Sequence, residues 1–328
     1  MRTAVVVPNW NGRDSLGDCL DSLLSQTLKP HIIVVENGSS DGSLEFLQTN
    51  YPGVQTLINK KNLGFAGGVN VGVKQAIADN YEYVALFNND AVADKDWLTH
   101  LVATLESYSE VGIATPKIIS RQAKELDSTG EMYSIWGLPF PRGRGETDLD
   151  KYDQHTYVFG ASGGASLYRI DMLNKIGLFD EDFFAYYEDV DLSFRAQLAG
   201  WEVRYVPTAI VHHQIGATSS KIKGFVTYQT LKNLPLLLWK NVPWAIMPRV
   251  WPRLLLAHTL FGLRALSRGQ FSAVAKGYIV GAWLWPKKLV ERHRIQHSRK
   301  VSSQYIWGLM VHDLPPSAKA LRKLVGRL

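Results

Sequence analysis

The sequence has almost no cysteine and no long apolar run. Cys19 is the only cysteine among the 328 residues, so the chain has no internal disulfide and no cysteine-based zinc site. A membrane-spanning helix needs a run of about 18 or more apolar residues, and the chain contains no such run. The first residues lead directly into a strand, without a charged and then apolar leader, so we expect no secretory signal.

Two phosphate-binding motifs are also missing. The glycine-rich segment 62–70 lacks the Gly-Lys-Ser/Thr ending of a P-loop, which disfavours an NTPase. The first strand opens into the loop 8–12, with the sequence Pro-Asn-Trp-Asn-Gly, which is not a dinucleotide-binding fingerprint. Four small residues of the segment 62–70 would still let its backbone approach a ligand closely: Gly64, Ala66, Gly67 and Gly68.

Charge is distributed unevenly along the chain. Residues 212–328 hold 19 Lys/Arg and two acids, a net charge of +17, whereas residues 1–211 hold 17 Lys/Arg and 28 acids, a net charge of −11. With 46% hydrophobic and 20% charged residues, the composition is that of an ordinary globular protein. The charge distribution indicates an acidic catalytic body followed by a basic, surface-seeking tail.

Strands and helices alternate over the first 115 residues. Short apolar runs predict strands at 3–8, 32–35, 54–58, 83–87 and 111–115. Periodicity and turn signals predict a helix capped by Asp14 or Ser15, and further helices at 43–49, from 70 to 79 and at 96–107. This alternation is typical of an α/β fold with a parallel sheet. We expect the Gly- and Pro-rich segment 121–153 to be an irregular lid or binding loop.

Beyond that segment the elements become shorter. The sequence predicts a helix from about 171, a helix from 188 to about 199, and two short strands at 203–206 and 209–213. No internal repeat is found.

The run Asn88-Asn89-Asp90 directly follows a predicted buried strand. Ligands bind beyond the carboxyl ends of parallel strands, and oxygen ligands there suit Mg²⁺ or Mn²⁺, which a diphosphate would share. The alternative is a polar turn in which Asp90 caps the next helix. In the loop after the second strand, Glu36, Asn37 and Asp41 are placed to hydrogen-bond a base and a ribose, although this loop could equally be a simple turn.

A second group of acids begins a predicted helix. Asp189 follows an aromatic run, 183–187, which would wall a cleft and raise the pKa of the carboxylate by desolvation. Such a carboxylate can act as general base towards an acceptor hydroxyl. For Asp191, a surface pair with Arg195 at i+4 is the favoured interpretation. His213 closes a predicted strand and is either a cation or diphosphate contact or a structural residue.

The order of these motifs resembles that of the family 2 glycosyltransferases, which are inverting enzymes of the GT-A fold. The motifs that carry the resemblance are Val6–Gly12, Val35–Ser43, Asn62–Gly68, Asn88–Asp90 and Tyr187–Leu192, followed by His213. Within the family the chain looks most like the bacterial rhamnosyltransferase-type members that build cell-surface polysaccharides. The resemblance covers residues 1–220 and implies a mostly parallel GT-A sheet flanked by helices, with a Rossmann-like nucleotide-binding half.

The resemblance also implies roles for individual residues. Asp189 would be the catalytic base, and Asp90 with His213 would hold Mg²⁺ or Mn²⁺. The donor nucleotide would lie against Pro8, Asn9, Asn11, Glu36, Asn37, Asp41, Asn62, Gly64, Phe65, Gly67, Asn88 and Asn89. The acceptor side of the cleft would be formed by Gly163, Gly164, Tyr187 and Glu188. Two departures from the family pattern are Glu36, where an Asp is usual, and a metal motif with a single acid.

The implied reaction is a single displacement that inverts the anomeric carbon. The expected enzyme is a hexosyltransferase that moves a sugar, with rhamnose from dTDP-rhamnose as the best guess and a UDP-sugar as the other donor class. The expected acceptor is a glycan or a polyprenyl-linked glycan. The alternative function is a catalytically silent nucleotide- or carbohydrate-binding scaffold of a polysaccharide assembly complex.

The sequence predicts a division into residues 1–220, a catalytic domain with a donor half (1–115) and an acceptor half (116–220), and a basic helical region, 221–328. Tryptophans among Lys and Arg in this region suit attachment to an anionic membrane surface, so we expect a cytoplasmic protein on the inner face of the membrane. The alternative is that the region packs on the catalytic body. No nucleic-acid-binding motif accompanies the basic residues, so we expect no nucleic-acid partner.

Overall fold

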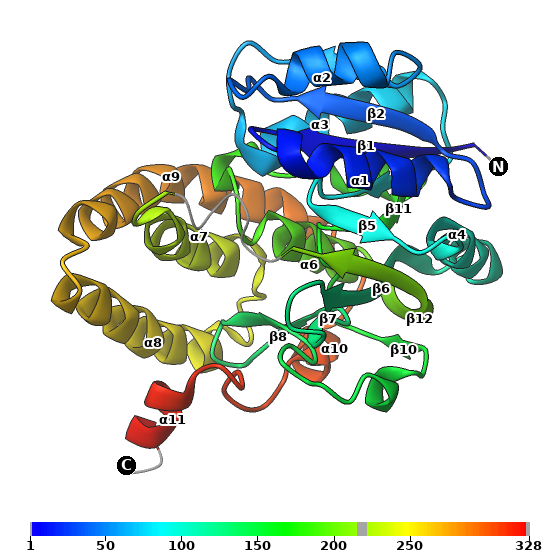
Figure 1. Cartoon of the computed structure of the whole chain (residues 1–328). Helices are drawn as coiled ribbons and strands as arrows, with labels where there is room; N and C mark the ends of the chain where they lie inside the picture. Colours follow the sequence, from blue (N-terminus) through cyan, green and yellow to red (C-terminus); the bar gives the residue numbers. More distant parts are fainter. Residues whose placement is uncertain (1, 215–221, 326–328) are drawn as a thin grey trace.

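The computed structural model describes residues 2–214 and 222–325 (Figure 1). The segment 215–221, over which the sequence predicts a domain boundary, lies outside the described residues. One ten-stranded sheet dominates the first 213 residues, and helices make up most of the remainder.

The sheet is mostly parallel, as the sequence predicts. Its order is β10-β12-β6-β11-β4-β1-β2-β3, with β5 paired to β12 and β7 paired to β6. Six strands run in one direction: β1 (Thr3–Asn9), β2 (His31–Glu36), β3 (Gln55–Ile58), β4 (Tyr83–Leu86), β6 (Val111–Ser120) and β12 (Glu202–His213). Four short strands run against them: β5 (Ala91–Ala93), β7 (Leu126–Ser128), β10 (Thr156–Tyr157) and β11 (Leu167–Arg169).

Helices cover both faces of this sheet, and the central strands are therefore buried on both faces. On one face, buried side chains of α1 (Arg13–Leu24) and α4 (Trp97–Ser107) pack on β1, β2 and β6. On the other face lie α3 (Gly64–Ala78), α5 (Ile170–Ile176) and α6 (Glu188–Leu198). The helix α2 (Ser43–Asn50) joins β2 to β3. This layering is that of an α/β fold.

Three local expectations are wrong. Helix α3 begins at Gly64, so most of the predicted loop 62–70 is helical; its glycine face lies close to the sheet, and a Cβ at Gly72 would lie 2.5 Å from Cγ1 of Val6. The two predicted strands after residue 202 are one strand, β12, with a bulge between Val206 and Ile210. Helix α1 has Gly12 as its N-cap residue, and no side chain caps it.

The predicted irregular loop 121–153 is partly ordered. It contributes β7 to the main sheet, the two-stranded hairpin β8 (Glu131–Tyr133) and β9 (Pro139–Pro141), and the short 3-10 helix η1 (Asp150–Tyr152). The hairpin strands are only three residues long, which is why their alternation left little signal in the sequence.

The C-terminal helices are α7 (Phe225–Asn241), α8 (Met247–Ser267), α9 (Phe271–His297), α10 (Ser303–Leu309) and α11 (Lys319–Val325). Side chains of α7, α8, α9 and α10 form a third hydrophobic core together with residues of α6. Within the described parts of the chain, no helix combines the length and the apolar character needed to cross a membrane.

Buried ion pairs join these helices to the sheet domain. Asp191 is fully buried and accepts hydrogen bonds from Arg195 at 2.9 Å and from Lys240 of α7 at 2.9 Å. Lys240 also lies 2.6 Å from Asp180, and Lys288 of α9 lies 2.5 Å from the same carboxylate. The expected pair of Asp191 with Arg195 is therefore confirmed, but its expected place on the surface is wrong. Basic residues of the tail meet acidic residues of the body, as one of the two interpretations of the tail requires.

Candidate active site

A cavity of about 920 Å³ opens where β1, β2, β4 and β12 end. Most residues that the sequence predicts for the donor, the metal, the base and the acceptor line it: Pro8, Asn9, Asn37, Asn62, Gly64, Phe65, Asn88, Asn89, Asp90, Gly163, Gly164, Tyr187, Glu188, Asp189 and His213. These residues come from segments up to 205 positions apart, and the sheet brings them together at one edge, as expected for ligand sites of open parallel sheets.

Glu36 and Asp41, by contrast, do not line the cavity; they form hydrogen bonds within the loops beside it. The carboxylate of Glu36 is buried and accepts hydrogen bonds from Nδ2 of Asn9 at 2.7 Å and from the backbone N–H of Ser39 at 2.8 Å. Asp41 accepts from the backbone N–H of Arg13 at 2.9 Å, which ties the loop after β2 to the start of α1. Glu36 thereby fixes Asn9, whose Oδ1 in turn accepts a hydrogen bond from Asn89 at 2.7 Å.

Asn11 and Gly67 also lie outside the cavity wall. Asn11 has a φ of +52° and accepts a hydrogen bond from the backbone N–H of Ser40 at 2.8 Å. Gly67 is buried, and a Cβ there would lie 2.8 Å from Cβ of Leu63. Both residues shape the loops that carry the lining side chains.

Asp90 and His213 both line the cavity, and their side chains are in contact. The Nε2 atom of His213 lies 3.1 Å from Oδ1 of Asp90, and its Nδ1 atom lies 2.8 Å from Oδ2 of Asp127. Burial lowers the pKa of His213, but the hydrogen bonds to Asp127 and Asp90 outweigh burial and raise the pKa to about 9. Asp127 in turn pairs with Arg144 at 2.6 Å. The imidazole is thus held in one orientation by Asp127, with Nε2 directed to Asp90.

Asp189 lies in the first turn of α6 and also lines the cavity. Its Oδ2 accepts a hydrogen bond from the backbone N–H of Gly163 at 2.9 Å, and its Oδ1 accepts one from the backbone N–H of Val190 at 2.8 Å. Burial raises the pKa of Asp189, and these two N–H groups partly offset the rise. This agrees with the expected desolvation by aromatic neighbours, since Phe184, Tyr186 and Tyr187 all line the cavity.

Two further carboxylates surround Asp189. Burial and the charge of Asp189 raise the pKa of Glu188 well above its usual value and that of Glu131 to about 8. Because burial and the charge of Asp189 favour the protonated forms of Glu131 and Glu188, Asp189 is the carboxylate of this group that carries a charge most readily. No cation pairs closely with these three acids among the described residues.

The loop that leads into α6 has an unusual backbone. Phe184, Tyr186 and Tyr187 have φ values of +63°, +68° and +73°, a region that bulky residues rarely adopt. Strain of this kind persists only where surrounding groups hold the backbone in place. Gly64 permits the closest approach, since a Cβ there would lie 2.4 Å from the carbonyl oxygen of Phe184.

Helix α7 supplies the groups that hold this loop. Nδ2 of Asn233 donates to the carbonyl oxygens of Phe183, Ala185 and Tyr186 at 3.0, 3.0 and 2.8 Å. Nζ of the neighbouring Lys232 donates to the carbonyl oxygen of Phe183 at 3.1 Å. The C-terminal helices therefore fix the backbone from which the Asp189 side chain projects.

The sequence reasoning missed several cavity residues. Asp127, Glu131 and Arg144 lie in the segment that was predicted only as a lid or binding loop, and that segment does line the cavity. Asp127 and Glu131 enclose a short Ser-Thr-Gly run, and Arg144 stands between two glycines. Both patterns are common in loops and mark no site. Asn233 and Lys232 lie in the helical tail, where nothing in the periodicity separates them from surface residues.

The family model described as Glycosyl transferase family 2 matches residues 4–177, more than half of the chain. The chain belongs to glycosyl transferase family 2. It is accordingly a glycosyltransferase that uses a nucleotide sugar. A relative from Mycobacterium tuberculosis, an N-acetylglucosaminyl-diphospho-decaprenol L-rhamnosyltransferase, is 28% identical over 235 residues, which cover 65% of this chain and 76% of the relative.

Solved glycosyltransferase structures share the fold of this family 2 member. The S. aureus protein TarS, residues 1–349 in complex with UDP-GlcNAc, aligns with a TM-score of 0.55 and 15% identity over 91% of each chain. The mannosyltransferase PcManGT from Pyrobaculum calidifontis, in complex with GDP-Man and Mn²⁺, aligns with a TM-score of 0.52 and 14% identity over 94% of this chain and 87% of that one. These likenesses confirm the GT-A fold that the sequence predicts.

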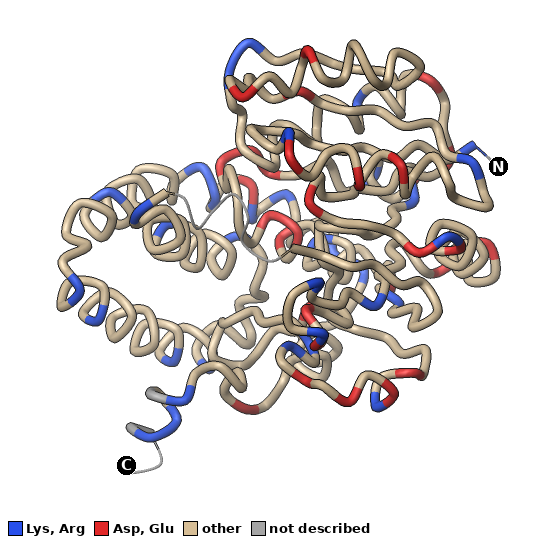
Figure 2. The backbone as a smooth tube through the Cα atoms, in the orientation of Figure 1, with Lys and Arg blue, Asp and Glu red and all other residues tan. Residues whose placement is uncertain are grey.

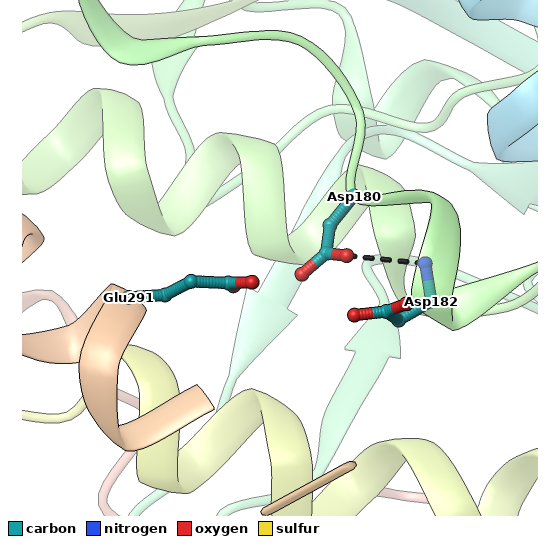
Figure 3. A group of neighbouring side chains, drawn as sticks. All are labelled: Asp180, Asp182 and Glu291. Carbon is teal, nitrogen blue, oxygen red and sulfur yellow. Dashed lines mark hydrogen bonds between the residues drawn. The ribbon is translucent and has the colours of Figure 1, made fainter. Parts of the chain in front are cut away.

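One group of three acids in the described part of the chain has the spacing of a metal site: Asp180, Asp182 and Glu291 (Figure 3). Figure 3 shows the carboxylates of Asp180 and Asp182, from the segment before α6, facing that of Glu291 on α9. The ammonium of Lys288 lies 2.5 Å from Asp180, 2.7 Å from Asp182 and 3.1 Å from Glu291. Because a lysine already supplies the positive charge, we assign this group to the ionic junction between body and tail.

The hydrogen bonds from Asn233 to the strained loop 183–186, called the clamp below, give a testable prediction. Asn233→Ala removes the two N–H donors that the three carbonyl oxygens share, each hydrogen bond worth about 1 kcal/mol, so the loop relaxes and the first turn of α6 shifts. We expect kcat of sugar transfer to fall about 10- to 100-fold, while the affinity for the nucleotide sugar changes less than about threefold, because most donor-pocket residues lie at the ends of β1, β2 and β4 and only the start of α3 touches the loop. Steady-state kinetics and a binding titration measure the two quantities.

Asn233→Asp keeps the shape of the side chain but removes its donor group, so it should lose as much turnover as Asn233→Ala. Gln229→Ala is the matched control, because Gln229 is a buried amide one turn earlier on α7 that makes no hydrogen bond with the described residues. Equal losses in the Gln229 and Asn233 variants would show that any buried change in α7 has this effect, and the clamp would be refuted.

Proposed function

We propose that this glycosyltransferase moves a sugar from a nucleotide diphosphate to an acceptor hydroxyl with inversion, and that Asp189 is the base. The observation that carries the proposal is the position of Asp189. Its carboxylate lines the cavity, is oriented by two backbone N–H groups, has a raised pKa, and shares the cavity with the Asp90–His213 pair. A general base with a pKa raised toward neutrality is suited to proton transfer near neutral pH.

The donor nucleotide would lie at the ends of β1, β2 and β4. Pro8, Asn9, Asn37, Asn62 and the start of α3 line this part of the cavity. The side-chain amide of Asn37 already donates a hydrogen bond to Asn62 at 3.1 Å and accepts one from Asn59 at 3.1 Å. It would therefore shape the nucleoside pocket more than it would bind the nucleoside itself. Glu36, Asp41, Asn11 and Gly67 act on the donor through the loops that they support.

The donor set at Asp90 fits a divalent cation. With Nδ1–H donated to Asp127, and with the Nε2 proton displaced when a cation binds, His213 would present Nε2 beside a carboxylate oxygen of Asp90, which is the carboxylate–histidine–metal arrangement common in metal sites. Asp90 and His213 would be the protein ligands, with Asn88 close by at 3.3 Å from Nε2. Bound Mg²⁺ or Mn²⁺ would neutralise the charge that develops on the leaving diphosphate.

The residues around Asp189 would handle the acceptor. Asp189 takes the proton of the attacking hydroxyl, whose oxygen then bonds to the anomeric carbon while the bond from that carbon to the diphosphate oxygen breaks. If Asp189 activates the acceptor hydroxyl on the side of the sugar away from the diphosphate, attack and departure occur on opposite faces, and one displacement inverts the centre. Gly163 and Gly164 keep the cavity wall around Asp189 shallow: a Cβ at Gly163 would lie 3.3 Å from Cβ of Asp189. Tyr187 and Glu188 complete it.

The finer specificity rests on the relatives. Because the M. tuberculosis relative is a rhamnosyltransferase named for a diphospho-decaprenol substrate, we propose rhamnose from dTDP-rhamnose as the sugar and a polyprenyl-linked glycan as the acceptor. We further propose that the protein takes part in cell-surface polysaccharide synthesis. Residues 1–220 would form the catalytic domain and 221–328 a basic helical region that attaches to the inner, anionic face of the cell membrane.

Donor and metal are tested together by thermal shift with dTDP-, UDP- and GDP-sugars in Mn²⁺ or Mg²⁺. A ligand at about 100 times its dissociation constant adds about 2.7 kcal/mol to the stability, and we expect dTDP- or UDP-sugars to give the largest shift. Asp90→Ala should lose the part of the shift that requires the cation. Asp94→Ala is the control, because Asp94 lies four residues away, is half exposed and does not line the cavity. A wild-type shift in Asp90→Ala would rule out the metal assignment.

The base is tested by Asp189→Asn, which keeps the size of the side chain and removes the proton acceptor. We expect turnover to fall about 10²- to 10⁴-fold with donor affinity nearly unchanged, because Asp189 faces the acceptor. Asp171→Asn, an exposed acid on α5 paired with Lys175, should retain full activity. Steady-state kinetics and donor titration decide the matter; full activity in Asp189→Asn would leave the chain without its proposed base.

A further inference from the structure

A second cavity lies among the C-terminal helices and has a different character. It has a volume of about 490 Å³ and is lined by apolar and aromatic side chains of α7, α8 and α9, with His258 and Tyr278 as its most polar members. His258 is itself satisfied, because its Nε2 atom lies 3.0 Å from the carbonyl oxygen of Leu231. The cavity size is within the range of small-molecule sites, about 300–1,000 Å³, and its wall offers nothing to a polar ligand.

The cavity exists because α8 diverges from α7 and α9, which pack closely on each other. Helices α7 and α9 pack closely through glycines: a Cβ at Gly277 would lie 2.8 Å from Cβ of Leu231, and one at Gly281 would lie 3.5 Å from the carbonyl oxygen of Lys232. Helix α8 comes close at Gly262, where a Cβ would lie 2.8 Å from the hydroxyl of Tyr278. Toward its N-terminal end α8 runs apart from α7 and α9 (Figure 1), and the cavity lies in this part of the hairpin.

Three tryptophans form one end of the cavity. The ring of Trp239 lies 5.0 Å from that of Trp251 and 5.8 Å from that of Trp285, measured between centroids. These large rings hold the helices apart without filling the space between them. A rigid, apolar slot of this kind suits a hydrocarbon chain.

The outer surface of α8 and α9 is suited to a membrane. These two helices carry ten of the seventeen large hydrophobic side chains that are exposed in the described parts of the chain, including Ile279, Trp283 and Val290, with exposed fractions of 68%, 76% and 74%. Figure 2 shows Lys and Arg along both helices, whose sole acid is Glu291. Exposed tryptophan and aliphatic side chains among cations are typical of helices that lie in an anionic membrane surface.

Helix α7 connects this cavity to the catalytic cavity. Phe225, Val226 and Thr230 line the catalytic cavity, and the next residue, Leu231, together with Pro235, lines the apolar one. At a rise of about 1.5 Å per residue and about 3.6 residues per turn, the two linings lie within a turn or two of each other along α7, on different faces of that helix. A ligand with a polar head in the first cavity and a hydrocarbon chain in the second would pass around α7.

We propose that the apolar cavity binds the hydrocarbon chain of a polyprenyl-linked acceptor and so presents the head of that lipid to Asp189. The proposal rests on the proposed function, in which the acceptor is lipid-linked. The exposed apolar face of α8 and α9 rests in the membrane from which the lipid enters. A phospholipid is the less suitable occupant, because nothing would require its binding site to adjoin the catalytic cavity.

The test uses a polyprenyl phosphate with a benzophenone in its chain, presented in vesicles of phosphatidylglycerol and phosphatidylcholine. After irradiation, mass spectrometry locates the label. We expect it on cavity-lining residues of α8 and α9, such as Trp251, Leu255 and Tyr278. Ala282→Phe, at an exposed position of the cavity lining, should reduce this labelling about tenfold. Leu255→Trp, at a half-exposed position of the α8 wall, provides a second obstruction with the same expected result.

Ala275→Phe is the matched control, because Ala275 is exposed on the same helix and does not line the cavity. It should label as the wild type does. Asp189→Asn should also label normally, because labelling needs neither donor nor turnover; full transfer activity in this variant with intact labelling would refute the proposed base and leave the lipid site standing.

Two results would overturn the proposal. One is labelling that is spread over the exposed faces of α8 and α9 and is unchanged by Ala282→Phe and Leu255→Trp. The other is displacement of the probe by dioleoylphosphatidylglycerol as readily as by unlabelled polyprenyl phosphate, which would make the cavity a general acyl-chain site.

Discussion

The strained backbone before α6 is the feature on which the rest of the site depends. Phe184, Tyr186 and Tyr187 take left-handed conformations that cost of order 1–3 kcal/mol each, and they keep them because two separate parts of the chain hold the loop. Asn233 and Lys232 of α7 bind its carbonyl oxygens, and the start of α3 fits against it only because residue 64 is a glycine. The donor side, the acceptor side and the C-terminal helices therefore meet at one short segment.

Electrostatics then gives neighbouring acids opposite properties. Asp189 and Asp191 are two residues apart in the first turn of α6. Asp191 is buried against Lys240 and Arg195, which outweigh burial and lower its pKa, whereas Asp189 has no close cation and burial raises its pKa. One acid thereby fixes α6 to the tail with a permanent charge. The other is left able to gain and lose a proton, which is the property that the proposed base requires.

The sequence predicted the fold and much of the site because the relevant signals are local. The apolar runs that end in Pro8, Glu36 and Asp90 gave both the strands and the edge at which their polar residues meet, and the aromatic run before Asp189 gave the desolvated carboxylate. Asp127 could not be found in this way, because its role comes from contact with His213, 86 positions later. Asn233 likewise acts only through carbonyl oxygens about 50 positions away, and the backbone conformation that it holds leaves no mark in hydrophobic periodicity. Glu36 and Asp41 show the converse: their residue types suit a nucleotide, but their hydrogen bonds are made to the loops around them.

The proposed role of Asp189 as base has one consequence that can be observed directly in the product. If the acceptor hydroxyl, activated by Asp189, attacks from the face opposite the diphosphate, each turnover inverts the anomeric carbon once. NMR of the purified product, compared with the donor sugar, reads the configuration from the anomeric signals. The account predicts an inverted linkage in every product molecule; a retained configuration would contradict it, because a single displacement cannot produce one.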